Sequence, residues 1–148
     1  MKIDRAGLPF VAVAALLTLV VASWIGPLFA IPPAALTLFV VWFFRDPHRV
    51  APDDSRLLIS PADGKILVAS SGKFSVFMNV FNVHVCRTPI AGRVRDVTHV
   101  SGSFLAAYRD DAAEHNERVT IVVDAGPYQV RFILVAGLIA RRIICRVH

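Results

Sequence analysis

The sequence predicts a mainly β domain, an antiparallel sandwich or partly open barrel, preceded by an N-terminal hydrophobic α-helical membrane hairpin. The hairpin is predicted because no charged residue occurs from Leu8 to Phe44. The β domain is predicted because, after Asp46, short apolar runs alternate with turns rich in Gly, Pro, Asp and Ser. No helical pattern separates these runs, so the strand–helix alternation of a parallel sheet is not expected.

Two pairs of helix-breaking residues, Gly26-Pro27 and Pro32-Pro33, divide the uncharged run. The run is too long for one bilayer crossing, which takes about 20 apolar residues. We therefore predict two arms, Leu8–Ile25 and Ala34–Phe44, and the second is short enough to be re-entrant or interfacial. A cleaved signal peptide is the alternative. Against it, the run exceeds an ordinary signal-peptide core and no small-x-small cleavage site ends it.

Basic residues flank the hairpin on both sides. Lys2 and Arg5 precede it, and Arg45, His48 and Arg49 follow it. The positive-inside rule predicts that both ends face the cytoplasmic side of the cell membrane. The net charge of +5 suits contact with an anionic membrane. A nucleic-acid partner is not expected, because the arginines are dispersed and do not alternate with aromatic residues that could stack on bases.

The end of the uncharged run has the composition of a headgroup boundary. Phe43 and Phe44 are followed directly by Arg45. The aromatic rings would lie at the edge of the hydrocarbon core and the guanidinium among the headgroups. We interpret Asp46, which comes next, as part of this anchor rather than as a catalytic group.

The chain divides into a membrane-anchoring hairpin, residues 1–49, and a β-rich domain, residues 50–148, which begins with the polar linker 51–56. The last apolar run reaches His148 without a capping turn, so we expect this domain to be incomplete at its C-terminus. Strands are predicted around residues 57–59, 65–68, 77–86, 94–100, 119–123, 128–135 and 138–147.

The two cysteines, Cys86 and Cys145, are far apart in the sequence. A cytoplasmic location predicts that both are free thiols, and they are too few for a metal cluster. The sequence also has no glycine-rich phosphate loop and no paired His/Glu metal spacing, so no metal site is expected.

Two ionisable residues are candidates for catalysis. His84 lies between Val83 and Val85 in a predicted strand, where a hydrogen-bonded core histidine is the ordinary interpretation. Asp63 precedes Gly64 in a turn, where an aspartate usually serves the turn itself. A carboxylate that accepts from one imidazole nitrogen leaves the other as a base able to activate a hydroxyl. Asp63 and His84 are therefore a candidate acid–base pair, although no serine stands out as their partner.

Several short motifs occur in order along the chain: Phe44-Arg-Asp-Pro47, Ser60-Pro-Ala-Asp-Gly64, Phe81-Asn-Val-His-Val85, Arg87-Thr-Pro-Ile-Ala-Gly92, Asn116-Glu-Arg118 and Ala140-Arg-Arg-Ile143. Together with the hydrophobic N-terminus, they resemble the short bacterial phosphatidylserine decarboxylase proenzymes over essentially the whole chain.

The resemblance implies a lyase of phospholipid biosynthesis that converts phosphatidylserine to phosphatidylethanolamine and CO2. Such a zymogen cleaves itself at a Gly-Ser bond, and the serine becomes a covalent pyruvoyl group, the electron sink for decarboxylation. By resemblance, Asp63 and His84 are the acid–base members of the self-cleavage triad, and His84 also serves in decarboxylation.

The sequence departs from the family pattern after Ala140-Arg-Arg-Ile143, where the Gly-rich segment and the cleavage-site Gly-Ser are expected. The chain ends at His148 first. We therefore expect it to form no pyruvoyl group and to be inactive alone, lacking the smaller subunit. The expected partners are phosphatidylserine, the anionic membrane, that smaller subunit, and a second chain in a homodimer or heterodimer. The alternative function is a non-catalytic, membrane-anchored β module that binds lipid or protein.

Overall fold

The computed structural model describes residues 2–52, 54, 57–70, 72–106, 108 and 111–147. Part of the predicted linker, at residues 53, 55 and 56, and the terminal His148 therefore lie outside the described residues. The chain forms two compact units. The first consists of Met1–Val50, Ala62–Gly64 and Met78–Cys86, and the second of Ala51–Pro61, Lys65–Phe77 and Arg87–His148.

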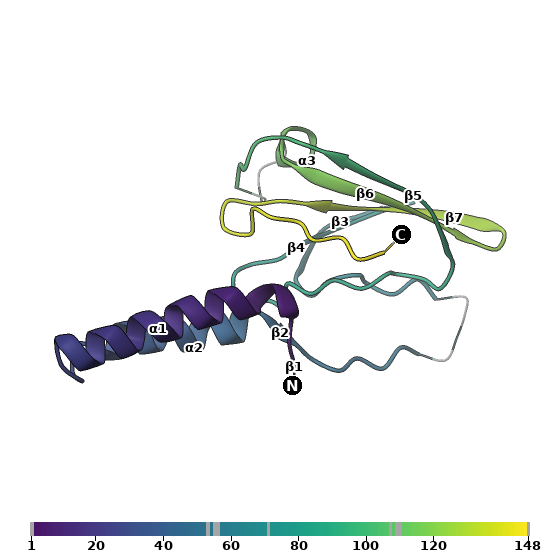
Figure 1. The fold of residues 1–148 in the computed structure, drawn as a ribbon. Coiled ribbons are helices and arrows are strands. Elements are labelled where there is room, and N and C mark those ends of the chain that lie inside the picture. The colour runs from purple at the N-terminus through teal and green to yellow at the C-terminus, as the bar shows by residue number, and fades with distance from the viewer. Residues whose placement is uncertain are drawn as a thin grey trace. The chain divides into compact units, whose positions relative to one another are not determined.

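The first unit contains the predicted hairpin. Helix α1 spans Leu8–Trp24 and helix α2 spans Ile31–Phe43, and the two lie side by side (Figure 1). Thr18 and Thr37 face each other between them, with their hydroxyl oxygens 3.0 Å apart. Each threonine also has its hydroxyl 2.9 Å from the carbonyl oxygen four residues earlier in its own helix. These polar groups are therefore satisfied within an apolar pair of helices.

The second arm begins earlier than predicted. Pro32 and Pro33 lie in the first turn of α2 rather than between the helices. Proline is tolerated there because the first amides of a helix have no intrahelical acceptor. The 13 residues of α2 rise about 20 Å, less than the ~30 Å hydrocarbon core. Of the described helices, only the segment Arg5–Trp24 is long and apolar enough to cross a membrane.

A short ribbon joins the two ends of the hairpin. Strand β1 (Lys2–Ile3) pairs antiparallel with β2 (Arg45–Asp46), and the short 3-10 helix η1 (Arg5–Gly7) leads into α1. Phe44 stacks on Phe10, with ring centroids 5.5 Å apart. A side chain at Gly7 would clash with the Phe44 ring, so glycine is required where the chain enters α1.

The second unit is antiparallel β structure. Strands β3 (Lys65–Ser70) and β4 (Lys73–Phe77) form one hairpin, with Gly72 at φ +79° in its turn. A separate sheet has the order β5-β6-β7, formed by Arg93–Val100, Arg118–Ala125 and Tyr128–Val135. Gly126, at φ +66°, makes the tight turn between β6 and β7. The one-turn helix α3 (Ala112–His115) precedes β6. The structure thus confirms a mainly antiparallel β chain with an N-terminal hydrophobic helix.

The core of the sheet lies on one face of β6, where Val119, Ile121 and Val123 are buried. Their alternation follows the two-residue period of a strand. The prediction of a final strand at residues 138–147 was wrong. Its alternate apolar residues, Ile143, Cys145 and Val147, pack against this core instead of pairing with a sheet edge (Figure 1).

The predicted strand at residues 77–86 was also wrong, because β4 ends at Phe77. Side-chain oxygens of Asn79 and Asn82 accept hydrogen bonds from the amides of Phe81 and Asn79, at 2.9 and 2.8 Å. The Asn82 amide in turn donates to the Asn79 carbonyl at 3.0 Å. These local bonds occupy amides that a strand ladder would need, so the segment turns. Residues 57–59, likewise predicted as a strand, are not one.

Asn116 of the Asn116-Glu-Arg118 motif is fully buried, and its side chain holds three hydrogen bonds. Its Oδ1 accepts from the Leu105 amide, and its Nδ2 donates to the carbonyl oxygens of Leu105 and Ala136, each at 2.8 Å. The side chain thus ties two irregular segments to the start of β6. A structural role accounts for this motif residue.

We expect Asn116→Ala to lower the free energy of unfolding by about 1–3 kcal/mol, since it leaves buried amide and carbonyl groups without partners. Urea unfolding of the purified protein measures this. Gln129→Ala is the matched control, because Gln129 donates a single exposed hydrogen bond to Asp124. Equal unfolding midpoints for the two variants would contradict the structural role of Asn116.

Candidate active site

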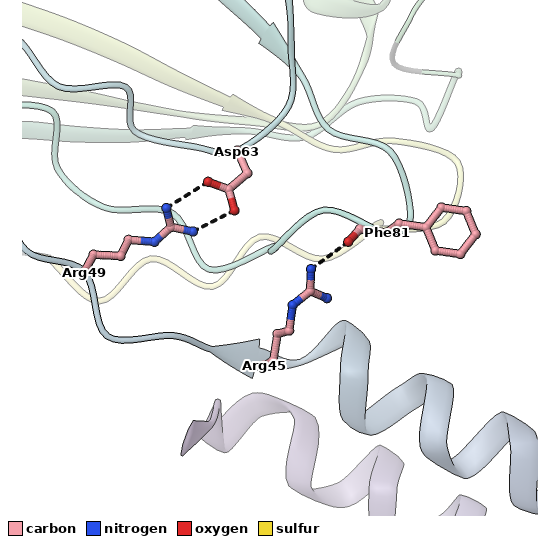
Figure 2. A network of polar contacts seen from close by, with 4 residues as sticks. All are labelled: Arg45, Arg49, Asp63 and Phe81. Carbon is pink, nitrogen blue, oxygen red and sulfur yellow. Dashed lines mark hydrogen bonds and ion pairs between the residues drawn. The ribbon is translucent and has the colours of Figure 1, made fainter. Parts of the chain in front are cut away.

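Asp63 lies in the segment Ala62–Gly64 of the first unit, where Arg49 binds it (Figure 2). Arg49 Nη1 donates to Asp63 Oδ1 and Nη2 donates to Oδ2, both at 2.8 Å. The guanidinium and the carboxylate therefore form a bidentate ion pair, which fixes the plane of the carboxylate as well as its position. Both side chains remain more than one-third exposed, at 37% and 38%.

This pairing sets the charge of Asp63. The hydrogen bonds from Arg49 lower the pKa of the Asp63 carboxyl, with partial burial opposing and the charges of Arg49 and Arg45 adding to the effect. The same contact raises the pKa of Arg49. Asp63 is therefore a carboxylate at neutral pH. Each of its oxygens retains a lone pair for a further donor.

His84 lies in the segment Met78–Cys86, also in the first unit, and it is half-buried. Its imidazole stacks on the ring of Phe43 at the end of α2, with centroids 4.2 Å apart and planes inclined by 26°. Nδ1 lies 3.0 Å from the carbonyl oxygen of Asn82. The Asn79–Asn82 turn thus places the backbone oxygen that orients the His84 ring.

The hydrogen bond of Nδ1 determines the tautomer of His84. A carbonyl oxygen can only accept, so the proton of the neutral ring is on Nδ1 and the lone pair is on Nε2. Burial lowers the pKa of His84, and the charge of Arg45 lowers it further, while the Asn82 carbonyl acts in the opposite direction. His84 is therefore neutral at pH 7 and can accept a proton at Nε2.

Arg45 connects the end of α2 to the segment that carries His84. Its Nη1 donates to the Trp42 carbonyl at 2.8 Å, and its guanidinium carbon lies 4.0 Å above the centre of the Trp42 ring. Its Nη2 donates to the Phe81 carbonyl at 2.7 Å (Figure 2). The Phe81 ring meets Phe39 of α2 edge to face, with centroids 6.4 Å apart. Residues 78–86 are thus packed on the hairpin through both rings and backbone.

The structure places both predicted site residues in one unit, but it does not join them directly. Among the described residues, no hydrogen bond links Asp63 to His84; Asp63 is bound by Arg49 and His84 by Asn82. Sequence reasoning missed Arg49, Arg45 and Phe43 as contacts of the site. Their position in or next to the Phe44-Arg-Asp-Pro47 motif could have indicated a role at the site, but the sequence analysis interpreted this motif as the membrane boundary.

Backbone bonds in the second unit hold together the chain on either side of these segments. The amide of Ile59 donates to the Pro89 carbonyl at 2.8 Å, and the amide of Arg87 donates to the Pro61 carbonyl at 2.9 Å. Pro61 directly precedes Ala62, and Arg87 directly follows Cys86. The Asp63 segment therefore begins next to the point where the His84 segment ends.

Within the described ranges, no group of three or more His, Cys, Asp or Glu side chains is arranged to hold a metal ion. Among the described residues, neither Cys86 nor Cys145 takes part in a disulfide bond. The two candidate catalytic groups that the structure describes are a fixed carboxylate and a neutral imidazole.

We expect Phe43→Leu to raise the pKa of His84 toward its ordinary value of 6.5, because removing the ring lets water reach the imidazole. Proton NMR titration of the imidazole measures this. A lowered pKa makes the folded state bind fewer protons than the unfolded one, so stability falls as pH drops from about 6.5 through the folded pKa. Phe43→Leu should weaken this acid sensitivity. Phe77→Leu, which removes a ring that contacts Tyr108 in the second unit, is the control. An unchanged titration in Phe43→Leu would be contrary evidence.

Comparison with known proteins places this chain in a family. The family model of phosphatidylserine decarboxylase matches residues 36–148. The chain is 44% identical to the phosphatidylserine decarboxylase proenzyme of Desulfotalea psychrophila over 155 residues, covering 97% of this chain and 72% of that protein. It is 43% identical to the proenzyme of Syntrophus aciditrophicus over 163 residues, covering 99% and 75%. It is 47% identical to the proenzyme of Chlorobium chlorochromatii over 118 residues, which cover 73% of this chain and 56% of that protein. The chain belongs to the phosphatidylserine decarboxylase family.

Proposed function

We propose that the protein is a phosphatidylserine decarboxylase, a carboxy-lyase that converts phosphatidylserine to phosphatidylethanolamine and CO2 at the membrane. The observation that carries the proposal, beside the family membership, is the state of His84. The imidazole of His84 is half-buried and neutral, and Phe43 and Asn82 fix its position. Its lone pair is on Nε2. Such a group is suited to proton transfer at neutral pH.

His84 is proposed to move protons at Nε2. In the maturation that the name proenzyme implies for its relatives, it would accept the proton of a nucleophilic hydroxyl, and it would exchange protons again during decarboxylation. Its low pKa keeps the base form populated at pH 7. The stack on Phe43 limits the directions in which the ring can turn.

Asp63 is proposed as the acidic partner in the same proton transfers. Arg49 keeps the carboxylate ionised and leaves a lone pair on each oxygen, so Asp63 can stabilise a positive charge that develops on a neighbouring base. In this structure each of the two has its own partner, Arg49 for Asp63 and Asn82 for His84.

The cofactor proposed from the family is a covalent pyruvoyl group. When present, it supplies the electron sink for loss of CO2. The side chains present fit such a group, since a neutral base and an ionised carboxylate are what proton transfer near neutral pH needs. This chain would contribute Asp63 and His84 to that chemistry.

The membrane setting follows from α1 and from the basic residues around the hairpin. We propose that residues 1–49 anchor the chain with both ends on the cytoplasmic side of the cell membrane, and that residues 50–148 form the β-rich decarboxylase domain. Phosphatidylserine is an anionic lipid of the bilayer, so an anchored enzyme meets its substrate without extracting it. A smaller subunit and a second chain are the further proposed partners.

The test is release of labelled CO2 from carboxyl-labelled phosphatidylserine by membranes that contain this chain together with the proposed smaller subunit. We expect His84→Ala to lower this rate by about 10²–10⁴-fold, the usual contribution of a general acid–base group. We expect Asp63→Asn to block the appearance of the active form.

His115→Ala is the matched control, since His115 is exposed in α3 of the second unit and its Nδ1 lies 2.9 Å from the Asp111 carbonyl oxygen. No phosphatidylethanolamine formation by the wild-type protein would overturn the proposal. The function would then be that of a membrane-anchored module that binds lipid or protein.

A further inference from the structure

We propose that Arg45 and Arg49 are positioning residues, which fix the two segments that carry Asp63 and His84 to the end of the membrane hairpin. We call residues 42–49 the hairpin base. The roles of Asp63 and His84 in this inference rest on the proposed function, whereas the attachment of their segments to the hairpin base is a separate structural claim.

The backbone of the hairpin base is itself held in place. Strand β1 pairs with β2 so that Lys2 lies opposite Asp46 and Ile3 lies opposite Arg45. The Asp4 amide donates to the Phe44 carbonyl at 2.9 Å. Arg45 therefore projects from a backbone that residues 2–4 hold by strand pairing and by a backbone hydrogen bond.

The guanidinium of Arg45 bridges its own helix end and the His84 segment. Two carbonyl oxygens, of Trp42 and Phe81, accept from its two terminal nitrogens, and the Trp42 ring lies against its face. The two partners are 3 and 36 positions away in the chain. A planar fork with two separate donors suits this bridge, whereas a lysine offers all its donors from one atom.

Arg49 makes the corresponding contact with the Asp63 segment. Its two parallel hydrogen bonds span 14 positions of the chain and fix the carboxylate plane. Two arginines four positions apart thus hold two different segments. Arg45 holds the backbone near His84, whereas Arg49 holds the Asp63 carboxylate itself.

Charge-preserving variants separate positioning from charge. We expect Arg45→Lys and Arg49→Lys each to lower kcat of decarboxylation roughly tenfold or more with little change in KM, since small misplacement of reacting groups is costly. Arg131→Lys is the matched control, because Arg131 is exposed on β7 in the second unit. Unchanged kcat in both variants of the hairpin base would overturn the inference.

The titration of Asp63 provides a readout besides activity. In Arg49→Gln the Asp63 carboxyl loses its main stabilising partner, so its titration midpoint, followed by carbon NMR, should move to higher pH. An Asp63 titration that is the same in wild type and Arg49→Gln would count against the ion pair.

Hydrogen exchange decides the structural claim without any activity assay. In lipid nanodiscs, we expect Arg49→Lys to speed amide exchange in Ala62–Gly64 and Arg45→Lys to speed it in Met78–Cys86, while β5-β6-β7 keeps its protection. If the wild type lacks decarboxylase activity but the two variants show these local increases in exchange, the proposed function fails and the positioning claim stands. Equal exchange in variants and wild type overturns the positioning claim whatever the activity.

Discussion

The paired hydrogen bonds from Arg49 to Asp63 join two parts of the chain that lie 14 positions apart, and they set both the direction and the charge of the carboxylate. These hydrogen bonds orient the carboxylate more than they stabilise the fold. Both side chains are over one-third exposed, and ion pairs of this kind contribute about 0.2–1 kcal/mol. A bidentate pair nevertheless permits only one relative orientation of its two planes. The ion pair thus fixes the direction of the carboxylate while adding little to the stability of the fold.

The two candidate catalytic groups owe their opposite ionisation properties to different surroundings in one unit. Asp63 is accessible and held by a cation, so its charged form is favoured; His84 is half-buried against Phe43, so its neutral form is favoured. Arg45 lowers the pKa of both groups, which strengthens the carboxylate and the neutral imidazole together. An ionised acceptor and a neutral base can therefore coexist over the same range of pH, which acid–base chemistry near neutrality requires.

Local signals in the sequence were sufficient for part of this arrangement. The uncharged run predicted the two helices, and short apolar runs between turns predicted the strands around residues 65–68, 94–100, 119–123 and 128–135, because these depend on near neighbours. Alternation was misleading at residues 77–86 and 138–147, where the apolar side chains pack on a helix or on a sheet face instead of joining a ladder. Asp63 and His84 were found as candidates, but their partners were not. Arg45 after two aromatic residues looks like a membrane anchor, and nothing local shows that its guanidinium reaches a carbonyl 36 positions away.

A double-mutant cycle on Arg49 and Asp63 tests the central contact most directly. The free energy of unfolding would be measured for the wild type, Arg49→Gln, Asp63→Asn and the double variant, each in the same detergent and at neutral pH. An ion pair between these side chains predicts a coupling of about 0.2–1 kcal/mol that disappears once the pH is low enough to protonate Asp63. Additive effects of the two substitutions at neutral pH would contradict the account, because the site would then be held in place without this contact.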